Sequence, residues 1–99
     1  MILVLESVTV PARKLQPAIS LNCEHMTHSR LEPDCILHDF HSNAETENHL
    51  AFFEPWGSIN APEKYFQVPE SGEFVIKIGK LASVAPKMNL YESKEIRRH

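Results

Sequence analysis

The central part of the chain, residues 35–56, reads CILHDFHSNAETENHLAFFEPW. Two runs rich in aromatic and branched apolar residues stand at its ends, and the polar segment Asn43–Asn48 separates them. Runs of this length and composition predict β-strands, and a short polar connection between them predicts a hairpin. Alternation within the first strand places Ile36, His38 and Phe40 on one face. The predicted strands are Cys35–Ser42 and His49–Trp56.

A strand and a long helix are predicted on the N-terminal side of this hairpin. Residues Ile2–Val10 are rich in Val, Leu and Ile and end at Pro11, which is typical of a strand. Over Lys14–Leu31 apolar residues recur at helical spacing, and Pro17 fits within the first turn, where its missing N–H costs little. A Glu-Pro-Asp sequence at residues 32–34 then ends the helix, since the residue before a proline avoids helical backbone angles.

Two helices and a strand are predicted on the C-terminal side of the hairpin. A short helix is expected over Pro62–Gln67. A longer helix is expected over Ser71–Val84, although the Phe-Val-Ile sequence at residues 74–76 also has strand propensity. A final strand is expected over Lys87–Ser93.

Apart from the short helix, these elements follow the order strand, helix, strand, strand, helix, strand. That order predicts one α+β domain over residues 1–99, with a ferredoxin-like βαββαβ fold and a four-stranded antiparallel sheet. The helices would cover one face of the sheet and leave the other apolar face open. In so small a domain a second copy of the chain commonly covers such a face, which predicts a homodimer.

The composition and charge exclude several classes of function. The net charge is −3 and no basic stripe is present beyond Arg97–Arg98 at the end of the sequence, so no nucleic-acid partner is expected. The apolar start, Met1–Leu5, is too short for a signal sequence or a membrane span, so no membrane partner is expected either. Two thiols without a secretory signal indicate a reducing compartment, and the cytoplasm is the expected location. Both cysteines, Cys23 and Cys35, are predicted to be small core residues.

The hairpin and its surroundings resemble the antibiotic biosynthesis monooxygenase family, in particular its small quinol-oxidising members. The Glu-Pro-Asp-Cys sequence at residues 32–35 stands where the family has Glu-Pro-Gly-Cys. His38 takes the place of a family aromatic residue, and Asn43 that of an Asp in the hairpin. The sequence Phe-Phe-Glu-Pro-Trp-Gly-Ser at residues 52–58 is similar to the family pattern Phe-x-x-Glu-x-Trp-x-Ser. Val68-Pro69 falls where the family commonly has Ser-Pro, so the resemblance covers nearly the whole chain.

The resemblance implies a dimeric α+β barrel that oxidises a small aromatic or quinol-type molecule without a cofactor. Family members that act on anthrone-like polyketides use an Asn, a Tyr, an Arg and a Trp, of which only the Trp is kept here, as Trp56. The other three positions hold Phe52, Pro62 and Ile76. The three residues that haem-degrading relatives use are replaced as well, by Ser7, Tyr65 and Val75.

Two residues are the candidate catalytic groups. Trp56 can stack on a flat aromatic substrate. His38 can take a proton from a phenolic hydroxyl near neutral pH. Each also has a simpler interpretation as a buried packing residue. Aromatic side chains are the candidate walls of the pocket, and the hydroxyl of Tyr65 can bond a substrate oxygen. The predicted substrate-binding residues are Phe40, Phe52, Tyr65 and Phe66.

Four other histidines are expected at the surface. His41 and His49 lie near the hairpin loop, and His25 and His28 are three residues apart on the first helix. The latter spacing permits metal ligation in principle. No acidic or thiol partner stands at a suitable spacing, so no metal site is predicted.

Two classes of function remain open. The first is a cofactor-independent monooxygenase or oxidase, in which a base deprotonates an electron-rich aromatic molecule and the resulting anion reduces oxygen itself. The second is a small-molecule-binding or structural homodimer that has kept the fold without the chemistry, because a fold alone does not fix a function. A haem-binding protein is a third, less favoured alternative.

Overall fold

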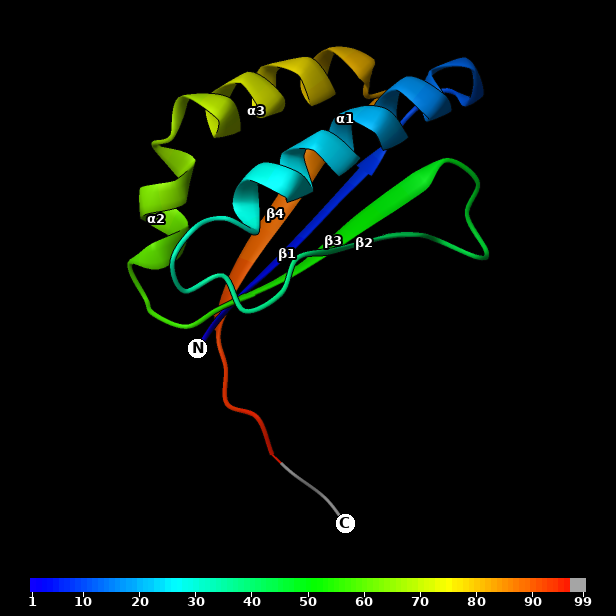
Figure 1. The fold of residues 1–99 in the computed structure, drawn as a ribbon. Helices are drawn as coiled ribbons and strands as arrows, with labels where there is room; N and C mark the ends of the chain where they lie inside the picture. Colours follow the sequence, from blue (N-terminus) through cyan, green and yellow to red (C-terminus); the bar gives the residue numbers. More distant parts are fainter. Residues whose placement is uncertain (97–99) are drawn as a thin grey trace.

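The computed structural model describes residues 1–96, in which helices cover one face of a four-stranded sheet (Figure 1). The strands and helices follow the predicted order, with one added 3₁₀ turn after the first strand. In chain order they are β1 (Ile2–Thr9), η1 (Ala12–Lys14), α1 (Leu15–Ser29), β2 (Asp39–Ser42), β3 (His49–Trp56), α2 (Ala61–Phe66), α3 (Pro69–Leu81) and β4 (Val84–Glu92).

The sheet is antiparallel and has the strand order β2-β3-β1-β4. The two central strands, β1 and β3, pair over their full lengths, with Val4 opposite Glu54 and Glu6 opposite Phe52. Helices α1 and α3 contact each other and lie over the same face of the sheet (Figure 1). The predicted α+β ferredoxin-like fold is therefore confirmed.

The first strand of the hairpin is shorter than predicted. Residues 35–38 precede β2, and there Cys35 forms an isolated bridge with Trp56 instead of joining a continuous ladder. Ile36 is 59% exposed, so it does not share the buried face on which His38 lies. The ladder starts late because the chain first has to leave the turn at Asp34, whose φ of 67° is left-handed.

The C-terminal elements, by contrast, begin earlier than predicted. Residues 74–76 lie within α3, so the helical interpretation is confirmed. This helix begins at Pro69, because a proline is favourable in the first turn. β4 begins at Val84 and contains Pro86, which an edge strand tolerates because one side of its backbone needs no partner. No helix among residues 1–96 is both long and apolar enough to cross a bilayer.

Helix α1 buries a face on which polar side chains lie among the apolar ones. Cys23, expected in the core, is exposed because it lies outside the buried stripe, and Cys35 is only half-buried. The buried residues of the helix are Ala18, Asn22, His25, Met26 and Ser29. Three of these five carry polar side chains that can hydrogen-bond beyond the helix backbone.

The chain after β4 leaves the sheet and extends away from it (Figure 1). The backbone N–H of Ser93 donates a hydrogen bond of 2.8 Å to the carbonyl oxygen of Met1, which fixes the point of departure. The basic pair Arg97–Arg98, singled out in the sequence, lies outside the described residues.

The space between the sheet and the helices contains two separate apolar clusters. On both central strands a glutamate stands between them on the inward face, Glu6 on β1 and Glu54 on β3. The Leu50 cluster consists of Val8, Val10, Ala18, Leu50, Phe52, Phe74 and Ile78. The Trp56 cluster consists of Ile2, Val4, Trp56, Ala61 and Tyr65.

Candidate functional site

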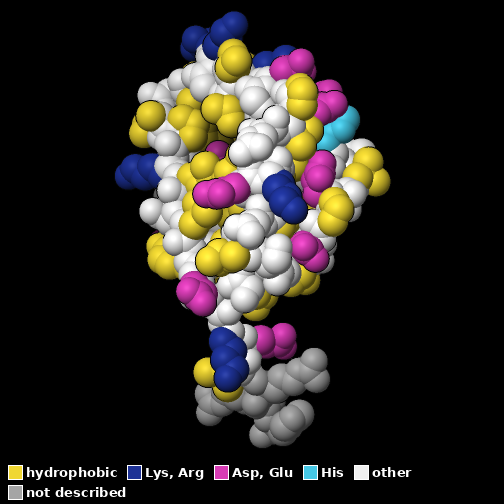
Figure 2. All heavy atoms as spheres, turned by 90° about the vertical axis from the view of Figure 1, so that its left-hand side faces the viewer, with side chains coloured by type: hydrophobic (Ala, Val, Ile, Leu, Met, Phe, Trp, Pro, Cys, Tyr) yellow, Lys and Arg dark blue, Asp and Glu magenta, His cyan; other side chains and the backbone are white. Residues whose placement is uncertain are grey.

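A cavity of about 230 Å³ lies between the sheet and the helices, at the level of the two glutamates. Figure 2 shows the side of the molecule on which α2 and α3 lie, where hydrophobic side chains gather around a recess with charged groups among them. Every helix and the strands β1, β3 and β4 contribute to the wall. The lining residues are Glu6, His25, Glu54, Phe66, Ser71, Phe74, Val75 and Met88.

Strand geometry places Glu6 and Glu54 in this cavity. Even-numbered residues of both strands point inward, as the burial of Val4 and Phe52 shows. Because Glu6 pairs with Phe52 and Glu54 with Val4, the two glutamates are diagonal neighbours on one face. Such neighbours lie about 7–8 Å apart between Cα atoms, within reach of long side chains.

Both carboxyl groups hold their protons more strongly than an exposed glutamate does. Burial raises the pKa of Glu6 to about 7. Burial, with a further contribution from the carboxyl of Glu6, raises the pKa of Glu54 to about 8, against a smaller lowering by the indole of Trp56. Desolvation and a like charge both disfavour the ionised form. Each of the two carboxyl groups therefore gains or loses its proton near neutral pH.

His25 is buried beside the glutamates, contrary to its predicted surface position. Its ring stacks on Phe74 with 3.8 Å between ring centroids, and its Nδ1 atom shares a hydrogen bond of 2.9 Å with the hydroxyl of Tyr65. Burial, and next the nearby His28, lowers the pKa of His25 to about 4. The ring is therefore neutral at pH 7 and can accept or donate one proton in hydrogen bonds.

His38 is fully buried just before β2 and does not line the cavity. Its Nδ1 atom is hydrogen-bonded to the hydroxyl of Ser29 and lies 3.7 Å from Oε1 of Glu54. Arg30 donates a hydrogen bond of 2.8 Å to the carbonyl oxygen of His38 and so holds this segment in place. Burial, with contributions from His25 and Arg30, lowers the pKa of His38 to about 3. His38 is thus a neutral group behind Glu54.

Trp56 and Tyr65 lie together on the other side of Glu54. Trp56 is fully buried, and its ring centroid is 5.5 Å from that of Tyr65. Within the described part of the chain, the indole N–H of Trp56 and Oε1 of Glu54 have no hydrogen-bond partner. Burial, and next the carboxyl of Glu54, raises the pKa of Tyr65, so its hydroxyl stays protonated.

The remaining predicted substrate-binding residues are divided between the cavity and the core. Phe66 lines the cavity. Phe52 belongs to the Leu50 cluster, and Phe40 packs against that cluster from outside. Of the hairpin histidines, His41 is exposed as expected, whereas His49 is half-buried and shares a hydrogen bond of 2.9 Å with the hydroxyl of Thr9.

Sequence reasoning missed Glu6 and the polar residues on the buried face of α1. Glu6 interrupts an apolar strand at an inward position, which is a readable signal once the strand's faces are assigned. Asn22, His25 and Ser29 continue from Ala18 at spacings of four, three and four, which is the spacing of one helix face. Among residues 1–96 no cluster of three or more His, Cys, Asp or Glu side chains is arranged to hold a metal ion.

Solved structures of other proteins share this fold over almost the whole chain. A candidate antibiotic biosynthesis monooxygenase from Deinococcus radiodurans matches with a TM-score of 0.93 and 17% identity, over 100% of this chain and 98% of that one. SnoaB, a cofactor-independent oxygenase from Streptomyces nogalater, matches in a variant form with a TM-score of 0.84 and 12% identity, over 96% of this chain and 94% of that one. The chain has the fold of the antibiotic biosynthesis monooxygenases. The resemblance in the sequence is thus confirmed at the level of the fold.

Sequence comparison gives less detail. No family model matches the chain. An uncharacterised protein of Synechocystis sp. is 31% identical over 94 residues, which are 95% of this chain and 64% of that protein. The chain therefore spans 64% of the length of this relative.

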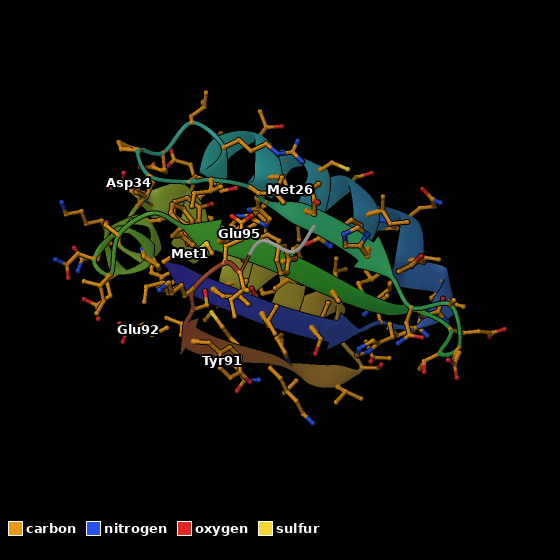
Figure 3. All side chains as sticks on the ribbon, turned by 90° about the horizontal axis from the view of Figure 1, so that it is seen from below. Met1, Met26, Asp34, Tyr91, Glu92 and Glu95 are labelled. Carbon is orange, nitrogen blue, oxygen red and sulfur yellow. The ribbon has the colours of Figure 1, made fainter. Side chains whose placement is uncertain are left out.

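The antibiotic biosynthesis monooxygenase fold leaves one face of the sheet without helices, and here that face is partly apolar. Leu5 and Phe53 stand opposite each other on the central strands and are 37% and 39% exposed. Tyr91 of β4, opposite Leu3, is 49% exposed at the edge of the same face. Figure 3 views the sheet from this side, with Tyr91 and Met1 labelled toward one end of the strands.

Proposed function

We propose that the chain is a cofactor-independent monooxygenase or oxidase that acts on a small aromatic or quinol-type molecule in the cavity between sheet and helices. The observation that carries this proposal is the cavity of about 230 Å³, in which the buried carboxyl of Glu54 and the half-buried carboxyl of Glu6 meet apolar walls. The fold shared with SnoaB, a cofactor-independent oxygenase, supports the reaction class. Apolar walls favour an aromatic ligand, and the carboxyl groups supply a base.

Glu54 is the proposed base, with Glu6 as its neighbour. A base works best when its pKa is near the working pH, and the pKa of Glu54 is raised to about 8 by burial. Removal of a phenolic proton leaves an electron-rich anion, which passes electrons to O₂. As an oxidase, the protein would turn a quinol and O₂ into a quinone and hydrogen peroxide. As a monooxygenase, one oxygen atom would replace two hydrogens as a carbonyl, and the other would leave as water.

The predicted catalytic residues, His38 and Trp56, enter this proposal on either side of Glu54. His38 approaches Oε1 of Glu54 to 3.7 Å, and Trp56 lowers the pKa of the same carboxyl. Both are therefore assigned to positioning and tuning the base. Tyr65 holds His25 in place by its hydrogen bond, and Phe66 is the aromatic wall.

Oxygen uptake with a panel of reduced quinones and anthrones tests the proposal. The wild type should consume O₂ faster than the spontaneous rate, and the rate should rise with pH through about 7–8, as Glu6 and Glu54 ionise. Glu54→Gln should lower the rate of oxygen uptake at least about tenfold, since a general base contributes on the order of 10²–10⁴-fold to a rate. Glu47→Gln, an exposed loop glutamate, is the matched control. An unchanged rate in Glu54→Gln would remove this residue from the mechanism.

A binding module without turnover is the second candidate. The observation that favours it is the placement of the replaced family positions. Phe52 and Pro62 are buried in packing and Ile76 is 61% exposed, so none of them presents a polar group to the cavity. Ligand binding with uptake no faster than the blank would support this candidate. A haem titration that gave no Soret shift would dismiss the haem alternative.

The proposed functional unit is a homodimer formed through the open face of the sheet. The exposed pair Leu5 and Phe53 supports this, because burial of such a face stabilises association. Phe53→Lys should convert the dimer to a monomer in sedimentation. Ile59→Lys, on the loop before α2 and 67% exposed, should leave the dimer intact. A wild-type monomer at micromolar concentration would contradict the proposal.

A further inference from the structure

Glu54 is a buried acidic side chain, and no charged cation among residues 1–96 is paired with it. It is 2% exposed, lines the cavity, and its Oε1 atom has no hydrogen-bond partner within the described residues. A buried, unsatisfied carboxyl is strongly unfavourable unless a partner is supplied. The side chain of Glu54 also lines the cavity together with that of Glu6, so a ligand in the cavity can bring a partner for the two carboxyl groups.

The basic groups near Glu54 do not provide this partner. His38 lies 3.7 Å away but is neutral, because burial lowers its pKa to about 3. Arg30 donates to the backbone carbonyl of His38 instead. His25, the one histidine in the cavity wall, is neutral as well, because burial lowers its pKa to about 4. The site is thus negative or neutral, and never positive, around pH 7.

The remaining elements around the cavity add no charge. Helix α3 contributes Ser71, Phe74 and Val75, and β4 contributes Met88. Apart from the hydroxyl of Ser71, these side chains and Phe66 of α2 surround the two glutamates with apolar and aromatic surface. Carboxylates combined with aromatic faces are a favourable environment for an organic cation, which gains both ion pairs and cation–π contacts.

The surface next to the cavity has the same electrostatic character. A neighbouring hollow between α1 and α3 shares His25 and Phe74 with the cavity. Glu24, Glu70 and Glu73 line it, against a single lysine, Lys77. An excess of acidic groups attracts cations and repels anions.

We propose that the cavity binds a small aromatic molecule that carries a protonated amine, with the ammonium group beside Glu6, within Coulombic reach of Glu54, and the phenolic end of the molecule toward Glu54. This inference deepens the proposed function, because it names the substrate class of the same cavity. An anion would meet two acidic groups, and a neutral phenol would leave them without a counter-charge. An ammonium group lets both glutamates ionise, so binding releases protons to the solvent.

Three probes of matched shape test the inference by calorimetry without oxygen, so that no turnover is needed. Tyramine is the cation, para-propylphenol the neutral analogue and para-hydroxyphenylpropionate the anion. At pH 7.5 tyramine should bind about tenfold more tightly than para-propylphenol, as one close ion pair supplies, and the anion should not bind detectably. Heats measured in two buffers of different ionisation enthalpy should show proton release with tyramine alone.

Variants then locate the charge. Glu54→Gln and Glu6→Gln should each reduce the preference for tyramine and the proton release, whereas the exposed Glu47→Gln should keep both. Equal binding of tyramine and para-propylphenol would overturn the inference, as would tighter binding of the neutral or anionic probe or no binding of any probe. A preference that survives both glutamate variants would also overturn it. Oxygen uptake is a separate readout, so failure of the amine inference leaves the proposed reaction independently tested.

Discussion

Two neighbouring regions of the space between sheet and helices are built on different principles. At one end the Leu50 cluster fills it with apolar side chains from β1, β3, α1 and α3. Next to it Glu6 of β1, Glu54 of β3 and His25 of α1 line the cavity, and together with His38 behind Glu54 they form a polar layer. On β1 the change happens between Val8 and Glu6, and on β3 between Phe52 and Glu54.

This difference separates what stabilises the protein from what equips it for chemistry. Burial of apolar surface stabilises the Leu50 cluster, and its residues have no unsatisfied polar atoms to place. The polar layer is costly to bury, since Glu54 and His38 each keep a buried atom without a hydrogen-bond partner among residues 1–96. Groups held in this way are typical of functional sites, where pKa values are shifted toward a task.

The largest effect is expected from damage to the apolar end. Leu50 is fully buried at the centre of its cluster. Leu50→Ala should lower the free energy of unfolding by about 3 kcal/mol, through lost burial and the cavity left behind. Urea unfolding measures this change. Leu31→Ala, at a residue that is 80% exposed, should change stability by no more than about 0.5 kcal/mol. Similar losses at both positions would contradict the assignment of the core.

The apolar end was largely predictable from the sequence, and the polar layer was not. The strand over His49–Trp56 and the helix that contains residues 74–76 were predicted, although Phe52 was assigned to the pocket and lies in the Leu50 cluster. Hydrophobic periodicity reports where apolar groups gather, so it identifies a core wherever the core is apolar.

The same method failed for α1 because the buried face of that helix is polar. Asn22, His25 and Ser29 face the sheet, whereas Cys23 is on the outside. A search for apolar periodicity therefore missed these polar residues and misplaced Cys23. His38 was found from its strand position, but its burial behind Glu54 depends on the close approach of α1 through Ser29. Such an approach is a tertiary contact that no local pattern encodes.

A second, intermediate effect concerns the pH dependence of the polar layer. The pKa of Glu54 is raised from 4.5 to about 8 in the folded protein, chiefly by burial. The stability linked to this group is fully present below the unfolded pKa, near 4.5, and is lost as the pH rises toward 8. Glu54→Gln removes this loss. The free energy of unfolding of the variant should exceed that of the wild type by about 2 kcal/mol at pH 8.5 and by much less at pH 5.

Urea unfolding of both proteins at the two pH values measures the difference. Glu47→Gln, in the exposed loop before β3, should give the wild-type profile. A Glu54→Gln variant that is less stable than the wild type at pH 8.5 would show that the carboxyl is ionised and partnered in the folded state.

The smallest effect is expected at His25, and it has the opposite sign along the pH axis. Burial lowers its folded-state pKa from 6.5 to about 4, so its contribution is complete above pH 6.5 and is lost as the pH falls toward 4. His25→Gln loses the stacking on Phe74 and is therefore less stable at pH 7. When the pH falls from 7 to 4.5, however, the free energy of unfolding of His25→Gln should decrease by about 1 kcal/mol less than that of the wild type. His41→Gln, at an exposed histidine, should follow the wild-type slope. Because the pKa of His38 is lowered as well, the stability of His25→Gln should still decrease in acid. A variant whose stability did not decrease in acid at all would assign the whole effect to His25.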